Sequence, residues 1–337
     1  MSTMNVLICQ QPKELVWKQR EIPIPGDNEA LIKIKSVGIC GTDIHAWGGN
    51  QPFFSYPRIL GHEASGIITE IGAKVSQWKI GQRVALIPYI SCGECDACRS
   101  GRTNCCEKIS VIGVHEDGAF KEYLAAPAKN ILAVDDQVDD ITAALIEPFA
   151  ISAHAVRRAE IKAGDDVLIV GAGPIGLGAA AIAAADGANV AIADTSAERR
   201  EHIKTQIKLP AFNPIDEKVE NFFNGKLPLI VIDATGNQKA MNNDVNLIRH
   251  GGRIVFVGLF KGDFSIHDPD FHKKETTLLG SRNATPEDFE KVQSLMAQGK
   301  LSAAMMLTHT FKFDQLAEVF EEQVVNNKDL IKSVVTY

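Results

Sequence analysis

Apolar and polar residues alternate in short runs through the first part of the chain. Residues 30–37 read ALIKIKSV and place an apolar side chain at every second position, which is typical of a half-buried strand. Glycine and proline residues recur between Pro23 and Pro88 and interrupt such runs. The pattern predicts a β-rich domain of short strands.

Further along the chain, short continuous apolar runs alternate with helix-like segments. An alanine-rich segment at 174–186 and a predicted helix at 237–250 separate several of these runs. The runs lie at 167–170, 190–193, 227–236, 252–260 and 276–281. This alternation predicts an α/β domain with a doubly wound parallel sheet, which binds ligands at the carboxyl ends of its strands.

A helix start is predicted close to residue 286. Thr285, Pro286 and Asp288 form a capping pattern with proline at the first helical position. We expect this helix to return the chain to the first domain, where a strand, an amphipathic helix and a final strand at 331–336 follow. The predicted domains are therefore 1–147 together with 286–337, and 148–285.

Composition narrows the class of protein. The chain has 337 residues and a net charge of −7, which argues against a nucleic-acid-binding surface. No apolar stretch is long enough to span a membrane, and the N-terminus lacks the pattern of a secretory signal, so a cytoplasmic location is expected. Five of the seven cysteines fall between Cys92 and Cys106, which favours a metal site over disulfides.

The glycine-rich turn after the run at 167–170 predicts a dinucleotide site. Gly171 allows a tight turn, Gly173 allows close approach of a pyrophosphate, and Gly176 allows the helix to pack on the strand. Pro174 and Ile175 open the helix, whose N-terminus offers free N–H groups to the phosphates.

An acid at the end of the next strand favours NAD over NADP. Asp194 can accept both ribose hydroxyls of the adenosine and would repel a 2′-phosphate. Arg199 or Arg200 could stack near the adenine or remain solvated, and they are the only feature in favour of NADP. Thr235, in a small-residue turn, and Gly258, at a strand end, are further candidate cofactor contacts.

The stretch CGECDACRSGRTNCC predicts a structural zinc site. Cys92, Cys95 and Cys98 are spaced by three, and Cys106 follows after a loop. Four thiolates close a tetrahedral zinc site with no open position. Cys105 could replace Cys106, although the spacing from Cys98 favours Cys106; an iron–sulfur cluster is the competing interpretation and fits only the triplet.

Three residues elsewhere are competent ligands of a catalytic zinc, which needs three protein groups and one open position. Cys40, His62 and Glu147 lie in SVGICGTDIHAWGG, YPRILGHEASG and ALIEPFAISAH. Each also has an ordinary structural interpretation: a small buried thiol, a core histidine and an acid at a helix entry.

The chain resembles the zinc-dependent medium-chain alcohol dehydrogenases. The resemblance is carried by four motifs in this order: GICGTD, LGHE, the four-cysteine lobe and VGAGPIG. The resemblance covers essentially the whole chain and implies a GroES-like catalytic domain with a Rossmann domain. Glu147 in IEPFAISAHAV is similar to the polyol and sorbitol dehydrogenase branch, whereas other members carry Cys there. Further stretches, including NQPFFSYPR and FHKKETTLLGSRNATPEDF, resemble bacterial sugar-acid dehydrogenases.

This resemblance implies NAD-dependent oxidation of a secondary alcohol, most closely that of L-galactonate to D-tagaturonate. L-gulonate, a sorbitol- or galactitol-type polyol and L-threonine are the alternative substrates. A zinc-free reductase on the same fold would lack Cys40, His62 and Glu147, and a redox sensor using the cysteine lobe belongs to another class of protein. Two zinc ions per chain would fit the enzyme.

The resemblance also assigns roles around the catalytic zinc. Cys40, His62 and Glu147 would surround it, with Glu63 either a direct ligand or a neighbouring partner, and Glu63 and Glu147 remain alternatives as the third ligand. Thr42 and His45 match the proton relay of the family. Asp43 would orient a ligand histidine; its alternative role is to cap a turn.

A sugar-acid substrate needs a partner for its carboxylate. Arg282 and Asn283 are the first candidates, although Arg282 could equally contact the cofactor or form an ion pair; Arg58 and Lys121 are alternatives. Phe53, Phe54 and Trp47 could line the pocket or belong to the core. The last strand of the second domain commonly pairs across a dimer in this family, so a homodimer or homotetramer is expected.

Overall fold

A computed structural model describes residues 2–51 and 54–337 of the chain, which divide into two compact units. Pro148–Met306 forms one unit, and the preceding residues join Leu307–Tyr337 in the other. The chain therefore returns to the first unit after Met306. The sequence pattern had predicted this return at residue 286. The reason is that α9 (Pro286–Ala297) is bonded to the second unit, where Arg157 of α4 (Ile146–Arg158) binds Asp288.

The first unit is built on antiparallel sheets. Its main sheet has the order β10-β6-β5-β3-β18-β17, and β9 also pairs with β3. These strands are β3 (Glu29–Ile39), β5 (Glu63–Ile71), β6 (Arg83–Leu86), β9 (Tyr123–Pro127), β10 (Ile131–Ala133), β17 (Leu307–Lys312) and β18 (Lys332–Thr336). A second sheet has the order β2-β1-β4, and β7 pairs with β8. These are β1 (Thr3–Gln11), β2 (Glu14–Glu21), β4 (Arg58–Ile59), β7 (Tyr89–Ile90) and β8 (Ser110–Val111).

The predicted alternation at 30–37 holds only in part of β3. Lys33 is exposed while Ile32 and Ile34 are buried, but the end of the strand, from Val37 to Ile39, is buried throughout. This end lies at the centre of the sheet, between β5 and β18, and α3 (Asp140–Ala144) packs against β3. Short helices connect the strands: α1 (Gly41–Trp47), α2 (Asp96–Arg99), α3 (Asp140–Ala144) and α10 (Leu316–Val319).

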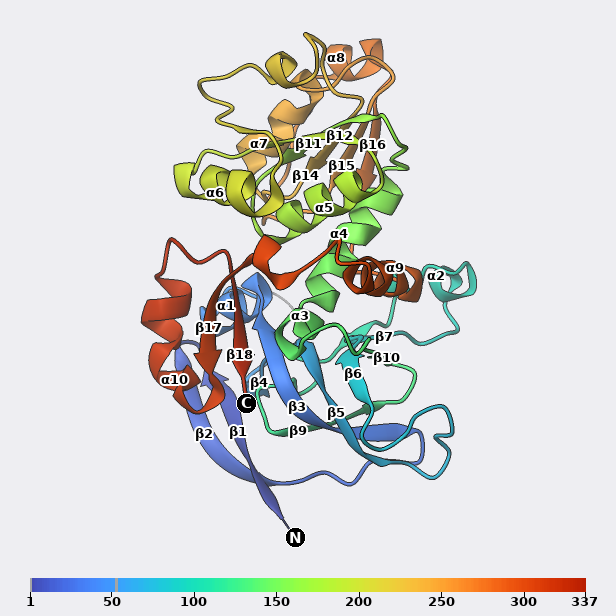
Figure 1. The fold of residues 1–337 in the computed structure, drawn as a ribbon, viewed down its shortest axis with the longest axis vertical. Coiled ribbons are helices and arrows are strands. Elements are labelled where there is room, and N and C mark those ends of the chain that lie inside the picture. Colours follow the sequence, from blue (N-terminus) through green and yellow to red (C-terminus); the bar gives the residue numbers. More distant parts are fainter. Residues whose placement is uncertain (1, 52–53) are drawn as a thin grey trace. The chain divides into compact units, whose positions relative to one another are not determined.

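The second unit contains one parallel sheet (Figure 1). Its strand order is β13-β12-β11-β14-β15-β16. The strands are β11 (Asp166–Val170), β12 (Asn189–Ala193), β13 (Ala211–Phe212), β14 (Ile230–Asp233), β15 (Arg253–Phe256) and β16 (Thr277–Gly280). The chain order reverses between β12 and β14, on either side of β11, which is where such sheets bind their ligands. The predicted doubly wound sheet is confirmed.

Helices connect the parallel strands, as the sequence pattern predicts. They include α5 (Pro174–Ala185), α6 (Ala197–His202), α7 (Gln238–Asn243) and α8 (Asp268–Lys273), together with α4 and α9. The predicted helix at 237–250 is shorter than expected, because α7 gives way to a 3-10 turn, η4 (Asp244–Asn246). The capping pattern before α9 is confirmed, with Thr285 and Asp288 forming a reciprocal capping box. Among the helices of the described residues, none is long and apolar enough to cross a bilayer.

Candidate active site

The glycine-rich turn has the geometry of a phosphate-binding turn. Gly171 follows β11 with a φ of 95°, a conformation that favours glycine. A Cβ atom on Gly176 would lie 1.9 Å from the Gly171 carbonyl oxygen, so only glycine fits where α5 meets the turn. A Cβ on Gly173, the N-cap of α5, would meet no protein atom within 4 Å. Pro174 and Ile175 then form the first turn of the helix, whose N-terminus remains open to an anion.

Asp194 lies directly after β12 and is bonded to the same turn. Its Oδ2 accepts a hydrogen bond from the Ala172 N–H at 2.7 Å, and its Oδ1 accepts one from the Ser196 N–H at 2.8 Å. Arg199 lies 3.9 Å from the carboxylate, whereas Arg200 donates to the Asp194 carbonyl oxygen. The carboxylate thus stands at the edge of the phosphate-binding turn, where an adenosine ribose would lie.

Thr235 and Gly258 lie on the two loops that follow β14 and β15. A Cβ on Gly171 would lie 2.8 Å from Thr235 Cγ2, and a Cβ on Gly258 would lie 2.1 Å from the Gly236 nitrogen. The loops are therefore in direct contact with each other and with the phosphate-binding turn. All the predicted cofactor residues of this unit except Arg282 belong to this contiguous edge of the sheet.

Three of the predicted zinc ligands come together in the first unit. Cys40 is the N-cap of α1, His62 precedes β5, and Glu63 begins it. One potential ligand atom from each of these three side chains lies within 4.8 Å of the others. Cys40 is partly buried, and His62 and Glu63 are buried. This is the arrangement that a metal ion bound by thiolate, imidazole and carboxylate requires.

Asp43 fixes the two backbone segments that carry Cys40 and His62. Its Oδ2 accepts from the Cys40 N–H at 2.9 Å and its Oδ1 accepts from the Gly61 N–H at 3.0 Å. His62 Nδ1 lies 3.7 Å from Oδ1, longer than a hydrogen bond. Burial opposes ionisation, but His62 and these N–H donors hold the pKa of Asp43 below its usual range. Both roles weighed for Asp43, capping and orienting the histidine, are thus compatible with its contacts.

Each buried carboxylate of this cluster has a partner that sequence reasoning missed. Glu63 Oε1 accepts a hydrogen bond from the Lys332 ammonium group, and Glu147 Oε1 accepts one from the Tyr89 hydroxyl. Lys332 is a polar residue inside the apolar run of the last strand, and this was the only signal in the sequence. Tyr89 gave no signal apart from its place in a predicted β-rich region.

The polar atoms left over in this cluster fit a metal ion. His62 Nδ1, Glu63 Oε2 and Glu147 Oε2 are buried and have no hydrogen-bond partner among the described residues. Burial raises the pKa of Glu147 to about 7, and Glu63 also raises it, whereas His62 lowers it. Buried carboxylate oxygens without donors are unfavourable unless a cation binds them. Glu147 does not belong to the compact group of three, but its free oxygen makes it a second carboxylate available to the same ion.

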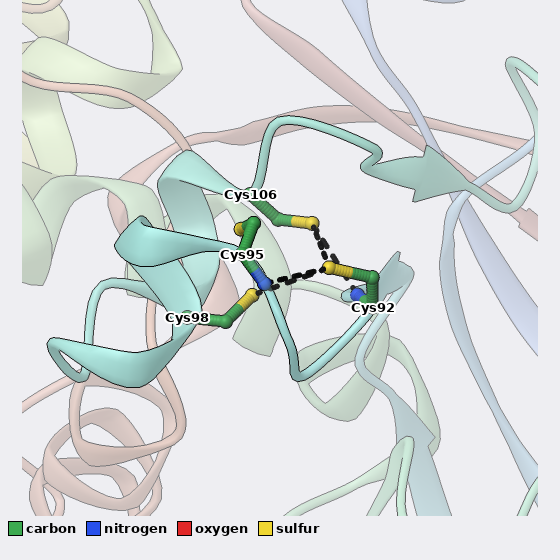
Figure 2. A group of neighbouring side chains, drawn as sticks. All are labelled: Cys92, Cys95, Cys98 and Cys106. Atoms are coloured by element: carbon green, nitrogen blue, oxygen red, sulfur yellow. Dashed lines mark hydrogen bonds between the residues drawn. The ribbon is translucent and has the colours of Figure 1, made fainter.

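The cysteine lobe brings four thiols together (Figure 2). The sulfur atoms of Cys92 and Cys106 lie 3.5 Å apart, those of Cys92 and Cys98 lie 4.0 Å apart, and Cys95 completes the group. Backbone N–H groups of Glu94 and Cys95 lower the pKa of the Cys92 thiol. Cys105 is exposed and lies outside the group, so the structure selects Cys106 as the fourth member. Four converging thiols with N–H donors fit a closed tetrahedral zinc site.

The two relay candidates share one short helix. Thr42 and His45 are three residues apart in α1, a spacing that places them on the same face. Thr42 is partly buried and His45 is exposed, so the face leads outward.

The aromatic candidates for the pocket differ in placement. Trp47 is buried against Phe320 in the core, which favours its core interpretation. Phe54 is partly buried and packs edge-on against Tyr56. Phe53 lies outside the described residues.

The candidate partners of a substrate carboxylate also differ in environment. Arg282 is exposed and Asn283 is partly buried in the loop after β16, where Asn283 has a φ of 52°. Arg58 donates to Ser55 and lies 3.8 Å from Asp117. Burial lowers the pKa of Lys121 to about 8, although Asp117 opposes the change. Arg58 and Lys121 therefore both lie near Asp117, whereas Arg282 stands in the loop between β16 and α9.

Comparison with known proteins decides the family. The chain matches the alcohol dehydrogenase GroES-like domain over residues 26–136 and the zinc-binding dehydrogenase family over residues 174–298. L-galactonate-5-dehydrogenase of Escherichia coli (strain K12) is 69% identical over 341 residues that cover 100% of both chains. The chain belongs to the zinc-dependent medium-chain alcohol dehydrogenases.

Solved structures of this dehydrogenase family have the same fold. A short chain alcohol dehydrogenase (rspB) from E. coli CFT073, complexed with NADH, is 33% identical with a TM-score of 0.92, and the match covers 100% of both chains. A zinc-binding dehydrogenase from Sinorhizobium meliloti 1021, bound to NADP, is 28% identical with a TM-score of 0.92 over 100% of both chains. The predicted family and its GroES-like and Rossmann domains are confirmed, and the chain is a dehydrogenase that uses zinc and a nicotinamide dinucleotide.

Proposed function

We propose that this dehydrogenase oxidises the secondary alcohol at C5 of a sugar acid, L-galactonate, to D-tagaturonate with NAD. The observation that carries the proposal is the 69% identity with L-galactonate-5-dehydrogenase over the whole chain. The match spans the whole chain and so includes the segments that carry the metal cluster and the dinucleotide turn. L-gulonate, a neutral polyol and L-threonine are the alternative substrates for the same machinery.

The catalytic zinc would be held by Cys40, His62 and a carboxylate. Glu63 belongs to the compact group of ligand atoms, and Glu147 offers a buried free oxygen beside it. Asp43 keeps Cys40 and His62 in place through their backbone segments. A second zinc would be held by Cys92, Cys95, Cys98 and Cys106, with a structural role.

A zinc ion held there would supply Lewis acidity that lowers the pKa of the substrate alcohol, and the dinucleotide would supply the hydride acceptor. Thr42 then takes up the alcohol proton at its Oγ1 and passes it to His45. Because His45 is exposed at the end of α1, it can release this proton to solvent. Asp43 lies between them in sequence but is fully buried and already bonded, so it is not part of this path.

The preference for NAD over NADP would come from Asp194. Both of its oxygens already accept backbone N–H groups, so the carboxylate is fixed at the ribose position. A 2′-phosphate there would face this negative charge at close range. Gly171, Gly173, Pro174, Ile175, Gly176, Thr235 and Gly258 would complete the cofactor site.

Arg282 would bind the carboxylate of the sugar acid, with Asn283 beside it. Arg282 is an exposed residue in the loop after β16, and a guanidinium can bind a carboxylate through two hydrogen bonds. Phe53 and Phe54 of the first unit are further candidates for contact with the substrate.

A homodimer or homotetramer is also proposed. β16 is the last strand of its sheet and pairs with β15 on one side only, within the described residues. Leu259 and Phe264, in the neighbouring loop, expose 86% and 45% of their surface, which favours burial against a second copy. The cytoplasm is the proposed location, since a reducing compartment keeps the cysteine lobe available to zinc.

The test is NADH formation by purified, zinc-loaded protein with L-galactonate, L-gulonate, D-sorbitol, galactitol and L-threonine. A strong preference for L-galactonate in kcat/KM supports the proposal. A preference for L-gulonate would change the stereochemistry of the substrate, and a preference for a neutral polyol or threonine would overturn the sugar-acid assignment. The fold and the metal sites would stand in either case.

A further inference from the structure

Two buried aspartates lie behind the dinucleotide turn, and the machinery described above does not use them. Asp233 is the last residue of β14, and Asp244 begins the 3-10 turn η4 after α7. Both side chains have no exposed surface, and their carboxyl groups are close enough to interact directly. Two carboxylates in contact cannot both be charged at low cost, so this pair needs a proton.

Among the residues that the structure describes, no cationic side chain is bonded to the pair. Asp244 lies next to the core cluster of the second unit, which includes Met241, Val245 and Ile248. The Lys274 ammonium group lies near η4 but donates to the carbonyl oxygens of Val245 and Ile248 at 2.7 and 2.8 Å.

The charged group of the neighbouring strand is also engaged elsewhere. Arg253 of β15 donates to Glu160 and to the Ala159 carbonyl oxygen. Asp233 Oδ2 and both oxygens of Asp244 have no hydrogen-bond partner among the described residues.

The other oxygen of Asp233 holds the cofactor loop. Asp233 Oδ1 accepts hydrogen bonds from the Thr235 N–H at 2.8 Å and from the Thr235 hydroxyl at 2.7 Å. Thr235 in turn stands against Gly171, and the next residue, Gly236, stands against Gly258. The pair thus supports the loop that lies on the phosphate-binding turn.

We propose that Asp233 and Asp244 share one proton and act as a positioning pair, which holds the Thr235 loop against the dinucleotide turn. Asp244 carries the proton and donates it to Asp233 Oδ2, which leaves Asp233 Oδ1 free to hold Thr235. Loss of the proton would put two negative charges in contact in an apolar core, push η4 and β14 apart and release the loop. The inference rests on the proposed cofactor role of Gly171 and Thr235.

The pKa values of the two aspartates decide at which pH the pair loses its proton. Burial, together with the neighbouring Asp233 charge, raises the pKa of Asp244 to about 9. Burial also raises the pKa of Asp233, against the Thr235 donors. Asp244 therefore keeps its proton in the folded protein at neutral pH but loses it in the unfolded chain near its ordinary pKa. The raised pKa of Asp244 therefore lowers the free energy of unfolding progressively as the pH rises from about 4 to about 9. Above about pH 9, both carboxylates of the folded protein are charged and repel each other.

The decisive variant is Asp244→Asn, whose amide donates to Asp233 at every pH. The first measurement is NADH affinity against pH, by fluorescence, for wild type, Asp244→Asn and Asp263→Asn, a matched control at an exposed acid of the same unit. Wild type and control should lose affinity at alkaline pH by up to about tenfold per pH unit, since one proton is linked. Asp244→Asn should lose much less. Equal slopes in all three proteins would overturn the proposal.

A second measurement does not depend on the cofactor. Infrared difference spectra of wild type minus Asp244→Asn near neutral pH should contain the C=O band of a protonated carboxylic acid. The melting temperature of Asp244→Asn, relative to that of wild type, should also increase as pH rises from about 4 to about 9. Absence of the band would overturn the shared proton. If the band is present but wild type binds no NADH at any pH, the proposed cofactor site fails and the acid pair stands.

Discussion

Lys332 Nζ donates a hydrogen bond to Glu63 Oε1 at 2.5 Å, and side-chain exposure is 2% and 1%, respectively. Burial opposes the charge of Lys332, but Glu63, with Cys40 and Glu147, outweighs it and raises the pKa of the ammonium group. The lysine thus neutralises part of a cluster that also carries the thiol and carboxylates of the proposed zinc site. A metal ion and Lys332 would share the charge of Glu63.

Lys332→Met should therefore destabilise the zinc-free protein more than the zinc-loaded protein. Removing one partner of a buried ion pair costs about 3–5 kcal/mol, and a bound cation would offset part of this loss. Trp17, Trp47 and Trp78 are the only tryptophans and all lie in the first unit, so fluorescence during denaturant unfolding follows this unit.

The matched background for this test is Glu63→Gln, which removes the charge that Lys332 pairs with. In that background Lys332→Met should cost much less than in wild type. The same loss of unfolding free energy in both backgrounds would show that Lys332 acts through packing and not through Glu63.

Cys98→Ser should remove one zinc ion per chain, because Cys98 belongs to the group of four converging thiols. Cys105→Ser should leave both zinc ions, because the exposed Cys105 lies outside that group. Zinc content of the purified variants, measured by elemental analysis, checks this. Loss of zinc from Cys105→Ser would contradict the choice of Cys106 over Cys105, and no loss from Cys98→Ser would contradict a zinc site at these thiols.

Asp194→Ala should weaken NAD binding and narrow the gap between NAD and NADP. The carboxylate would lose its hydrogen bonds to the ribose, each worth about 1.5–3 kcal/mol for a charged group, or roughly tenfold to a hundredfold in affinity. The Ala172 and Ser196 N–H groups would also lose their acceptor, which adds to the loss. Unchanged kinetics with both cofactors would exclude Asp194 from the ribose site. Arg249→Ala, at a partly exposed arginine paired with Asp166, serves as a control for charge change in this unit.

The sequence allowed the dinucleotide turn to be predicted in detail because strand, turn and helix are contiguous there. The choice of Cys106 over Cys105 also followed from local spacing. Contacts over long separations could not be predicted this way: Lys332 and Glu63 are 269 residues apart, and Lys332 resembles any polar residue in a strand. The cap of α9 was predicted correctly, but its unit was not, because its partner Arg157 lies 131 residues before Asp288.

Asp288, which caps α9, should contribute to the stability of the fold in a pH-dependent way. Burial alone would raise the pKa of Asp288, but hydrogen bonds with His154 and Arg157 outweigh it and hold the pKa well below its usual range. Its folded pKa is lower than its unfolded pKa, so its contribution is complete above the unfolded value, about 4, and is lost as pH falls through the folded value.

Asp288→Asn should therefore destabilise the protein by about 2–4 kcal/mol near neutral pH, as expected for loss of a buried charged partner. The difference from wild type should stay constant down to about pH 4 and shrink at lower pH. Calorimetric melting of both proteins across this range measures it. Asp186→Asn, at a partly exposed ion pair with Lys291, should have a much smaller effect. A difference that grows as the solution becomes more acidic would contradict the sign of this argument.

Arg282→Ala should raise the KM for sugar acids more than the KM for neutral polyols. If Arg282 binds the substrate carboxylate, its loss removes a charged hydrogen bond worth about 1.5–3 kcal/mol, which is roughly a tenfold to hundredfold change. A neutral polyol has no carboxylate, so its KM should change little. Arg58→Ala tests the alternative partner in the first unit, where Arg58 lies near Asp117 and Ser55. Equal losses for acids and polyols in Arg282→Ala would mean that this arginine serves the cofactor or the fold. Selective loss in Arg58→Ala would move the carboxylate site to the first unit.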